Sequence, residues 1–333
     1  MRNDDGPLVL AMAGVPQKML DQLSRDFRLL GPVETPIAKS IPNLAKERIS
    51  GIRILLTRGS SETSREAMAA LPNLGLIACI CAGCDGLDLG AARELGIWVT
   101  NSPGVGADSV ADLAVALLIA VTRKIFDSNR ALRVSGLLEP WPPTTGLTGR
   151  RAGIYGLGAI GSRVASRLRA MGMQVAYSGR QSHPDVQYPH MGSLLALAKW
   201  ADSLIVCVPA TEQTVGSVDA NILAALGPQG HIVNVGRGSI VDTAALCCAL
   251  ETGLIAGAGL DVFDPKYLDR LLALPGAVLT PHIGGSTTQA ESAMCDMVGR
   301  NMAAFLSGNE PINPVFRVSR SQNRGVSPAS QGP

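Results

Sequence analysis

Three closely spaced glycines in the middle of the chain place the strongest constraint on its fold. Gly156, Gly158 and Gly161 follow a short apolar segment, residues 152–155, and precede a stretch whose apolar residues recur at helical spacing. A strand, a tight turn and a helix in this order are typical of the loop that binds the pyrophosphate of a dinucleotide. The first glycine permits the turn, the second lets the backbone approach the phosphates, and the third lets the helix pack on the strand. The sequence therefore predicts a dinucleotide-binding fold with the pyrophosphate at a helix N-terminus.

The end of the next strand predicts which dinucleotide is preferred. Chains that bind NAD usually carry an Asp or Glu about 20 residues beyond the first glycine, where it bonds the ribose hydroxyls. Here the strand at residues 174–177 is followed by Ser178, Gly179 and Arg180 instead. A carboxylate would repel a 2′-phosphate, whereas a hydroxyl and a guanidinium both bond to it. We therefore expect NADP(H) to be preferred over NAD(H).

Length, charge and apolar runs limit the class of protein. The 333 residues suffice for two domains with separate cores, and the formal net charge is only +2, with the basic residues scattered. This pattern argues against a nucleic-acid or anionic-membrane partner. The apolar run at residues 113–121 is too short to cross a membrane, and the N-terminus carries acids where a secretory signal carries Lys or Arg. A cytoplasmic enzyme is expected.

The seven cysteines lie mostly in apolar segments, which suits a reducing compartment. Cys81 and Cys84 have the spacing of a redox motif or of half a zinc site, and Cys79 lies just before them. The sequence contains no second Cys/His pair with zinc spacing. We therefore expect these cysteines to pack in the protein interior, and we expect no metal site. The adjacent Cys247 and Cys248 receive the same interpretation.

The order of the segments predicts an α/β protein of two open α/β domains. Strands that alternate with helices in residues 1–102 predict a flavodoxin-like substrate domain, which residues 286–316 complete. Residues 103–285 are expected to form an inserted Rossmann cofactor domain. We expect further strands at residues 8–12, 52–57, 76–81, 97–100, 203–208, 231–235, 255–260, 278–279 and 312–316. The apolar segment 107–124 predicts a buried connecting helix or a dimer element, and the polar tail 317–333 is expected to be disordered.

Three polar side chains follow apolar strands of the cofactor domain. Arg237, Asp264 and His282 each come just after such a strand. An arginine can bond a carboxylate and an adjacent carbonyl oxygen together, and a histidine can exchange a proton near neutral pH. A carboxylate beside the histidine keeps the imidazole protonated and oriented. These are the requirements for hydride transfer to a 2-oxo acid.

The motifs of this chain occur together, and in the same order, in one family. They are AGCDGLDLGAARELGIWVTNSPG, GLGAIG, NVGRGSIVD, GAGLDVF and LTPHIGG. Over residues 8 to 316 the chain resembles the D-isomer-specific 2-hydroxyacid dehydrogenases, and among them the NADPH-dependent glyoxylate/hydroxypyruvate reductases. The resemblance implies reduction of a small 2-oxo acid to the D-2-hydroxy acid. It also suggests a homodimer that associates through the region of helix 107–124.

The resemblance assigns roles to individual residues. It implies that His282 donates the proton, that Arg237 binds and polarises the substrate, and that an acid, Asp264, pairs with His282. Backbone N–H groups of Ala82, Gly83 and Cys84 are implied to receive the substrate carboxylate. The implied cofactor-binding residues are Gly156, Leu157, Gly158, Ala159, Ile160, Gly161, Ser178, Gly179, Arg180, Pro209, Thr214, Val235, Asp261 and Gly284, with Asp261 near the nicotinamide.

One departure from the family pattern leaves two registers for the acid. The family usually has two residues between its Asp-Val-Phe and the Glu-Pro that supplies the acid, whereas Asp264, Pro265 and Lys266 follow directly here. Without a deletion, Lys266 would occupy the place of the acid. Counting back from His282 instead places Asp264 and Pro265 on Glu-Pro after a two-residue deletion. We prefer this second register.

Two other functions are compatible with the same motifs. One is reduction of an aromatic 2-oxo acid such as hydroxyphenylpyruvate, because sequence does not measure the substrate pocket. The other is a non-catalytic protein that senses NADP(H), because a fold does not by itself imply a reaction. The presence of both Arg237 and His282 favours the enzyme.

Overall fold

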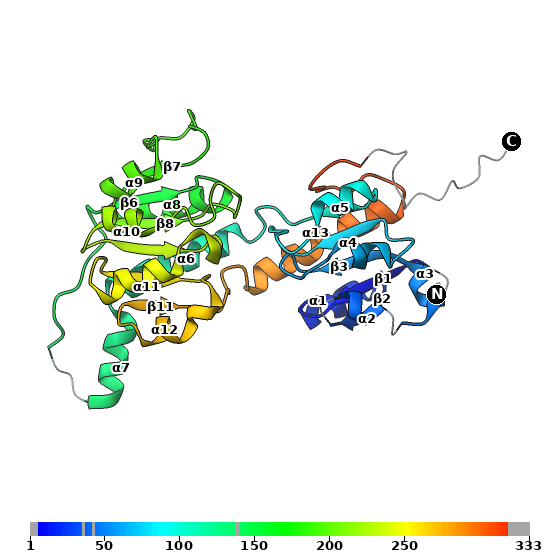
Figure 1. Ribbon diagram of the computed structural model, residues 1–333, viewed down its shortest axis with the longest axis horizontal. Helices are drawn as coiled ribbons and strands as arrows, with labels where there is room; N and C mark the ends of the chain where they lie inside the picture. The colour runs from blue at the N-terminus through cyan, green and yellow to red at the C-terminus, as the bar shows by residue number, and fades with distance from the viewer. Residues whose placement is uncertain (1–5, 35–36, 42–43, 137–139, 319–333) are drawn as a thin grey trace. The chain divides into compact units, whose positions relative to one another are not determined.

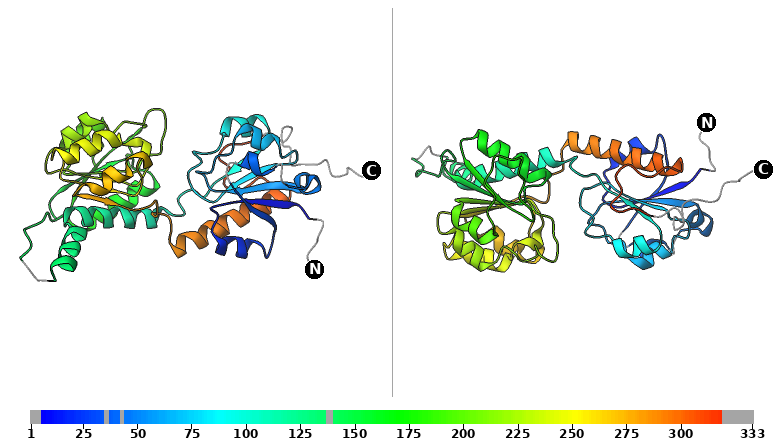
Figure 2. Two further views of the ribbon diagram at one scale, coloured as in Figure 1. Left: turned by 60° about the horizontal axis from the view of Figure 1, so that its bottom comes forward. Right: turned by 90° about the horizontal axis from the view of Figure 1, so that it is seen from above.

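The computed structural model describes residues 6–34, 37–41, 44–136 and 140–318, and the predicted disordered tail lies outside these residues from 319 onward. The chain forms two compact units, Met1–Gly106 with Thr288–Pro333, and Ala107–Thr287. Each contains a single parallel sheet with helices on both faces (Figure 1 and Figure 2). The prediction of two open α/β domains is confirmed.

The first unit contains a five-stranded sheet in the order β2-β1-β3-β4-β5, which is the flavodoxin-like order. Its strands are β1 (Leu8–Met12), β2 (Arg28–Val33), β3 (Ile52–Thr57), β4 (Leu76–Cys79) and β5 (Trp98–Thr100). Its helices are α1 (Gln17–Leu23), α2 (Ile37–Ser40), α3 (Lys46–Gly51), α4 (Arg65–Ala69), α5 (Leu89–Glu94) and α13 (Thr288–Leu306). The C-terminal helix α13 packs against α1 and β4, so the end of the chain completes the first sheet's helical layer.

Two elements of this unit differ from the sequence-based expectation. Strand β2 was not expected, because Gly31 and Pro32 interrupt its apolar pattern and its residues are only partly buried. It lies at the sheet edge, where a proline needs no ladder donor. The expected strand at residues 312–316 forms only an isolated antiparallel bridge between Pro314 and Thr100.

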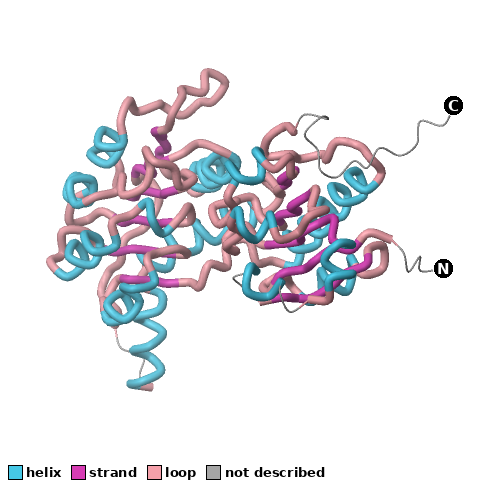
Figure 3. The backbone as a smooth tube through the Cα atoms, turned by 45° about the vertical axis from the view of Figure 1, so that its right-hand side comes forward, coloured by secondary structure: helices cyan, strands magenta, loops and turns pink. Residues whose placement is uncertain are grey.

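The second unit contains a six-stranded sheet in the order β11-β10-β9-β8-β6-β7. Its strands are β6 (Arg151–Tyr155), β7 (Gln174–Ser178), β8 (Ser203–Val206), β9 (His231–Asn234), β10 (Gly257–Leu260) and β11 (Ala277–Leu279). Its α-helices are α6 (Ala107–Thr122), α7 (Ile125–Ser135), α8 (Ala159–Ala170), α9 (Leu194–Trp200), α10 (Ala220–Leu226), α11 (Thr243–Glu251) and α12 (Leu268–Ala273). Short 3₁₀ turns lie at Gly238–Ile240 and Pro265–Tyr267. Figure 3 shows the helices (cyan) on both sides of the strands (magenta).

A single parallel bridge at the edge of this sheet completes the Rossmann strand order. Tyr177 of β7 bridges to His190, which follows β7 in the chain. With this bridge as a rudimentary third strand, the order becomes 3-2-1-4-5-6-7, which is the dinucleotide-binding order 3-2-1-4-5-6 with β11 added at one edge.

Two glycines in β10 explain why α6 is so apolar. A Cβ at Gly257 would lie 2.5 Å from Val121 Cγ2, and a Cβ at Gly259 would lie 2.9 Å from Leu117 Cβ. The missing side chains let α6 pack directly on the sheet, and Leu117 and Val121 are buried there. The apolar face of α6 is therefore part of the second unit's own core.

Within the described part of the chain, no helix combines the length and the apolar composition that crossing a membrane requires.

The buried His231 makes stability depend on pH. His231 is 5% exposed, and its Nδ1 has no hydrogen-bond partner among the described residues. Burial, with Arg150 nearby, lowers the pKa of its imidazole from 6.5 to about 4. The folded state therefore disfavours the imidazolium, and the stabilisation by the neutral ring is present above pH 6.5 and lost as the pH falls towards 4. At about 1.4 kcal/mol per pKa unit, the loss in the free energy of unfolding over this pH range amounts to about 3 kcal/mol.

We expect the free energy of unfolding of the wild type, measured with urea, to fall as the pH is lowered from 6.5 to 4. In His231→Leu, the free energy of unfolding should change less over the same pH range. The exposed His183 provides the control, since His183→Gln should retain the wild-type slope. Parallel profiles for wild type and His231→Leu would contradict the assignment.

Candidate active site

The turn between β6 and α8 has a different requirement at each of its glycines. Gly156 adopts φ +97°, and a Cβ there would lie 2.6 Å from Val208 Cγ1. A Cβ at Gly161 would overlap the Gly156 carbonyl oxygen, so the helix start packs directly on the turn. At Gly158, which precedes the first residue of α8, a Cβ would meet nothing within 4 Å. The middle glycine therefore faces open space at a helix N-terminus, which fits a pyrophosphate.

The predicted cofactor-selecting residues lie at the end of the neighbouring strand β7. The Gly156 N–H donates to the Ser178 carbonyl oxygen at 2.8 Å, which ties this strand end to the glycine turn. Ser178 is buried, Gly179 is half-buried and Arg180 is exposed. Among the described residues, the Arg180 guanidinium has no hydrogen-bond or ion-pair partner. Its charge is available to an anionic ligand beside the turn.

The remaining predicted cofactor residues lie at the carboxyl ends of neighbouring strands. Leu157, Ala159 and Ile160 belong to the turn and the first residues of α8. After β8, Thr214 Oγ1 donates to the Pro209 carbonyl oxygen at 2.7 Å. After β9, the Val235 N–H donates to the Val206 carbonyl oxygen at 3.2 Å. Because β8 and β9 continue the sheet next to β6, these groups share one sheet edge with the glycine turn.

The loop that carries His282 is built around the carboxylate of Asp261. This carboxylate accepts hydrogen bonds from Thr280 Oγ1 at 2.6 Å, from the Ile283 N–H at 2.8 Å and from the Gly284 N–H at 2.9 Å. Asp261 is 3% exposed. Between these contacts His282 adopts φ +55°, an uncommon conformation for a residue with a side chain, and its ring is exposed. The buried carboxylate thus holds an exposed imidazole in a defined place.

A buried asparagine organises the neighbouring loop that carries Arg237. Asn234 ends β9, and its Nδ2 donates to the carbonyl oxygens of Arg237 at 3.0 Å and Val262 at 3.2 Å. Its Oδ1 accepts from the Gly236 N–H at 3.1 Å. Asn234 belongs to the motif NVGRGSIVD, and an amide at the end of an apolar strand is the signal in the sequence that could have predicted this role. Asn234 joins the Arg237 loop to the loop after β10.

Asp264 has its own partners in this structure. Its Oδ2 lies 2.8 Å from Lys266 Nζ, and its Oδ1 accepts from the Lys266 N–H at 3.1 Å. The ammonium of Lys266 lowers the pKa of the Asp264 carboxyl, and Asp264 begins the 3₁₀ turn at Pro265–Tyr267. The two residues that the sequence offered as alternatives for the acid therefore form an ion pair with each other. Pairing of Asp264 with His282 stays a prediction.

The carboxyl ends of β9, β10 and β11 bring the predicted catalytic side chains to one edge of the second sheet. Arg237, Asp264 and His282 follow these three adjacent strands. Arg237 is half-buried, and its Nη1 donates to the Gly236 carbonyl oxygen at 2.8 Å. A guanidinium after β9 and an imidazole after β11, at the same edge of the sheet, can bind a carboxylate and exchange a proton.

The predicted carboxylate-binding loop belongs to the first unit. Asn101 Nδ2 donates to the Ala82 carbonyl oxygen at 2.7 Å, and the Ser102 N–H donates to the Cys81 carbonyl oxygen at 3.1 Å. The N–H groups of Ala82 and Gly83 donate to no acceptor among the described residues. The loop therefore has its carbonyl groups bonded and two N–H groups available for an anion.

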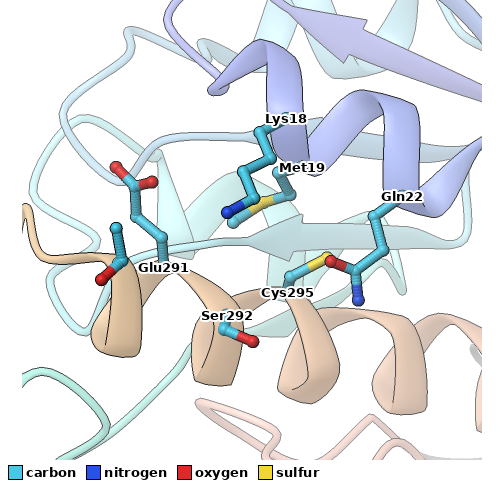
Figure 4. Close-up of a pocket in the computed structure, with 7 residues that line it drawn as sticks. Lys18, Met19, Gln22, Glu291, Ser292 and Cys295 are labelled. Atoms are coloured by element: carbon cyan, nitrogen blue, oxygen red, sulfur yellow. The ribbon is translucent and has the colours of Figure 1, made fainter.

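A small pocket of the first unit lies apart from these predicted residues. Helices α1 and α13 form it, and Figure 4 shows side chains from both lining it. The lining residues are Lys18, Met19, Gln22, Thr288, Glu291, Ser292 and Cys295. In the described residues, no group of three or more His, Cys, Asp or Glu side chains could hold a metal ion.

Comparisons with known proteins agree with the motifs. Residues 115–284 match the family described as D-isomer specific 2-hydroxyacid dehydrogenase, NAD binding domain. Glyoxylate/hydroxypyruvate reductase A of Arabidopsis thaliana is 36% identical over 311 residues, which cover 92% of this chain and 98% of the relative. Hydroxyphenylpyruvate reductase of Plectranthus scutellarioides is 35% identical, with 92% and 98% covered.

A solved structure shows a similar arrangement. It is the crystal structure of an NADPH-dependent glyoxylate/hydroxypyruvate reductase from Sinorhizobium meliloti in complex with NADP and malonate. It matches with a TM-score of 0.84 and 35% sequence identity, covering 93% of this chain and 96% of that one.

Substitutions at two glycines of the turn between β6 and α8 should separate cofactor binding from the stability of the fold. Gly158→Ala adds a methyl group in open space, so we expect the free energy of unfolding to change by less than about 0.5 kcal/mol. We expect the same methyl to crowd a pyrophosphate bound at this turn and to raise the Kd for a nicotinamide dinucleotide such as NADPH at least about tenfold, or about 1.4 kcal/mol. Gly161→Ala should instead destabilise the fold by about 1–3 kcal/mol, because its methyl overlaps backbone. Urea unfolding and fluorescence titration measure both quantities; unchanged NADPH affinity in Gly158→Ala would remove the turn from the binding site.

Proposed function

Because the chain belongs to the D-isomer-specific 2-hydroxyacid dehydrogenases, we propose that it reduces a small 2-oxo acid of the glyoxylate/hydroxypyruvate type. The product is the 2-hydroxy acid, of D configuration where it is chiral. The observation that carries this proposal is the Asp261-anchored loop, which presents the His282 imidazole at the sheet edge where Arg237 also lies. The names of the relatives, among them glyoxylate/hydroxypyruvate reductase A of Arabidopsis thaliana, support the substrate class.

The proposed roles follow from the chemistry of each group. NADPH, when bound at the glycine turn, supplies the hydride. Arg237 binds the oxo acid through its planar guanidinium and polarises the carbonyl group. His282 donates a proton to the carbonyl oxygen. We assign the N–H groups of Ala82, Gly83 and Cys84 to the substrate carboxylate.

Asp264 is proposed as the acid that keeps His282 protonated. This role requires its carboxylate to exchange Lys266 for the imidazolium. Both members of the present ion pair are exposed by a third or more, with side-chain exposures of 35% for Asp264 and 68% for Lys266. Exposed ion pairs contribute little to stability, so the exchange meets little resistance.

Preference for NADPH is part of the proposal. It is supported by the Arg180 guanidinium beside the glycine turn and by the NADP complex of the Sinorhizobium meliloti reductase. A carboxylate is missing from the strand end at Ser178–Arg180, so no charge there opposes a 2′-phosphate.

A homodimer through the region of residues 107–124 is also proposed, with the adjoining helix α7 as part of the contact. Helix α7 has no buried residue, and Phe126 and Val134 are 59% and 84% exposed. Apolar side chains gathered on an uncovered helix are typical of protein interfaces. The seven cysteines are all free, which supports the proposed reducing, cytoplasmic location.

Oxidation of NADPH with a panel of 2-oxo acids tests the reaction. We expect turnover with glyoxylate and hydroxypyruvate to exceed that with hydroxyphenylpyruvate. The reverse order would favour the second candidate function, reduction of an aromatic 2-oxo acid. The 35% identical hydroxyphenylpyruvate reductase of Plectranthus scutellarioides supports that candidate. His282→Asn should lower turnover by about 10² to 10⁴, because the proton donor is lost, and should leave the Kd for NADPH near its wild-type value. Absence of turnover with every acid, together with tight NADPH binding, would indicate a non-catalytic sensor.

Arg180→Ala tests the cofactor preference. A hydrogen bond to a charged group contributes roughly 1.5–3 kcal/mol, so loss of the guanidinium should raise the KM for NADPH at least about tenfold. The KM for NADH should hardly change, because NADH has no 2′-phosphate. Arg169→Ala, which removes an arginine from the last turn of α8, serves as the control and should leave both values unchanged. Equal catalytic efficiencies of the wild type with NADH and NADPH would contradict the preference.

A further inference from the structure

Two cysteines at the start of the predicted carboxylate-binding loop lie close together in the first unit. Cys79 ends β4 and is fully buried. Its Sγ lies 3.5 Å from the carbonyl oxygens of both Cys81 and Gly83. The chain after β4 therefore folds back over this thiol, which brings Cys84 next to it.

The two thiols interact directly. A side-chain hydrogen bond with Cys84 is the largest cause, and burial the second, of a pKa of the Cys79 thiol well above its usual range. Cys79 therefore stays protonated. Cys84 is half-buried and therefore more accessible to a small oxidant than Cys79. A more accessible thiol beside a buried one is the arrangement of an attacking and a resolving cysteine.

We propose that Cys79 and Cys84 form a reversible disulfide under oxidation by hydrogen peroxide, and that this bond controls the Ala82–Gly83 anion site. The effect on substrate rests on the proposed function; the disulfide itself does not. The CxxC spacing of Cys81 and Cys84 suggests a different pair. However, the Cys84 side chain packs against the core cluster that contains Cys79, and Cys79 Sγ contacts the carbonyl oxygen of Gly83, the residue directly before Cys84.

One molecule of hydrogen peroxide suffices to oxidise the two thiols to the disulfide. The Cys84 thiolate attacks an oxygen of hydrogen peroxide, the O–O bond breaks, and a sulfenic acid and hydroxide form. The Cys79 sulfur then attacks the Cys84 sulfur, the S–S bond forms, and the sulfenic oxygen leaves as water with the Cys79 proton. Two thiols lose two electrons and two protons in total, and the peroxide is reduced to two waters. A dithiol reverses the reaction by thiol–disulfide exchange.

The bond would disturb the groups that form the anion site. Ala82 and Gly83 lie between the two cysteines, and the Cys79 S–H contact to the Gly83 carbonyl oxygen is lost on oxidation. The hydrogen bond from Asn101 to the Ala82 carbonyl oxygen does not involve a cysteine and would remain. Gly83 cannot shift towards the sheet, because its carbonyl oxygen already packs against Gly59. We therefore expect the Ala82 and Gly83 N–H groups to be displaced and the substrate carboxylate to bind more weakly.

Peptide mapping without reducing agent tests the disulfide in the full chain. After peroxide treatment we expect a peptide that joins Cys79 to Cys84 and the loss of two thiols in a thiol titration, both restored by dithiothreitol. Cys81→Ser is the matched control and should still form this bond, whereas Cys84→Ser should not. A Cys81–Cys84 bond, or persistence of both thiols while other cysteines oxidise, would overturn the proposal.

The activity readout separates this proposal from the proposed function. Peroxide should raise the KM for glyoxylate at least threefold in the wild type and in Cys81→Ser, with recovery after dithiothreitol, and should not do so in Cys84→Ser. An unchanged KM in a chain mapped as fully cross-linked would overturn control of the anion site. If no 2-oxo acid is reduced, the proposed function fails while the mapping still decides the disulfide.

Discussion

The Asp261 carboxylate, almost fully buried, accepts three hydrogen bonds from the loop that carries His282. A buried carboxylate is stable only when such donors satisfy it, so the loop and the acid depend on each other. The loop must bend sharply to bring two consecutive N–H groups onto one carboxylate. His282 adopts its positive φ at this bend, which leaves its ring exposed while its backbone is fixed.

The neighbouring strand end repeats this construction with a neutral amide. Asn234 bonds the Arg237 and Val262 carbonyl oxygens, and it thereby joins the loops after β9 and β10. The two predicted catalytic side chains, Arg237 and His282, are thus carried by short loops whose backbones are held by buried polar groups. The cost of burying those groups without partners gives the loops little freedom to rearrange. Such rigidity suits catalysis, which requires charged groups held in place before the substrate arrives.

The cysteine pair shows a different use of a strand end. At β4 the buried polar group is a thiol, which bonds carbonyl oxygens weakly and can exchange those contacts for a covalent bond. In the loop that follows, Asn101 and the Ser102 N–H bond the carbonyl oxygens of Ala82 and Cys81. The proposed disulfide would join the end of β4 to this loop.

The sequence alone determined the fold class, the family and the sheet edge of the second unit where the polar side chains gather. It could do so because strand periodicity and the order of the glycine-rich motifs depend on local geometry, which each segment carries within itself. Edge strand β2 escaped prediction because Gly31 and Pro32 disturb that pattern, and pairing with β1 compensates for it only in the folded sheet. The partners of Asp261, Asn234, Asp264 and Cys79 were decided by the tertiary structure. A hydrogen bond depends on distances of a few tenths of an ångström between loops, and no spacing along the chain encodes them.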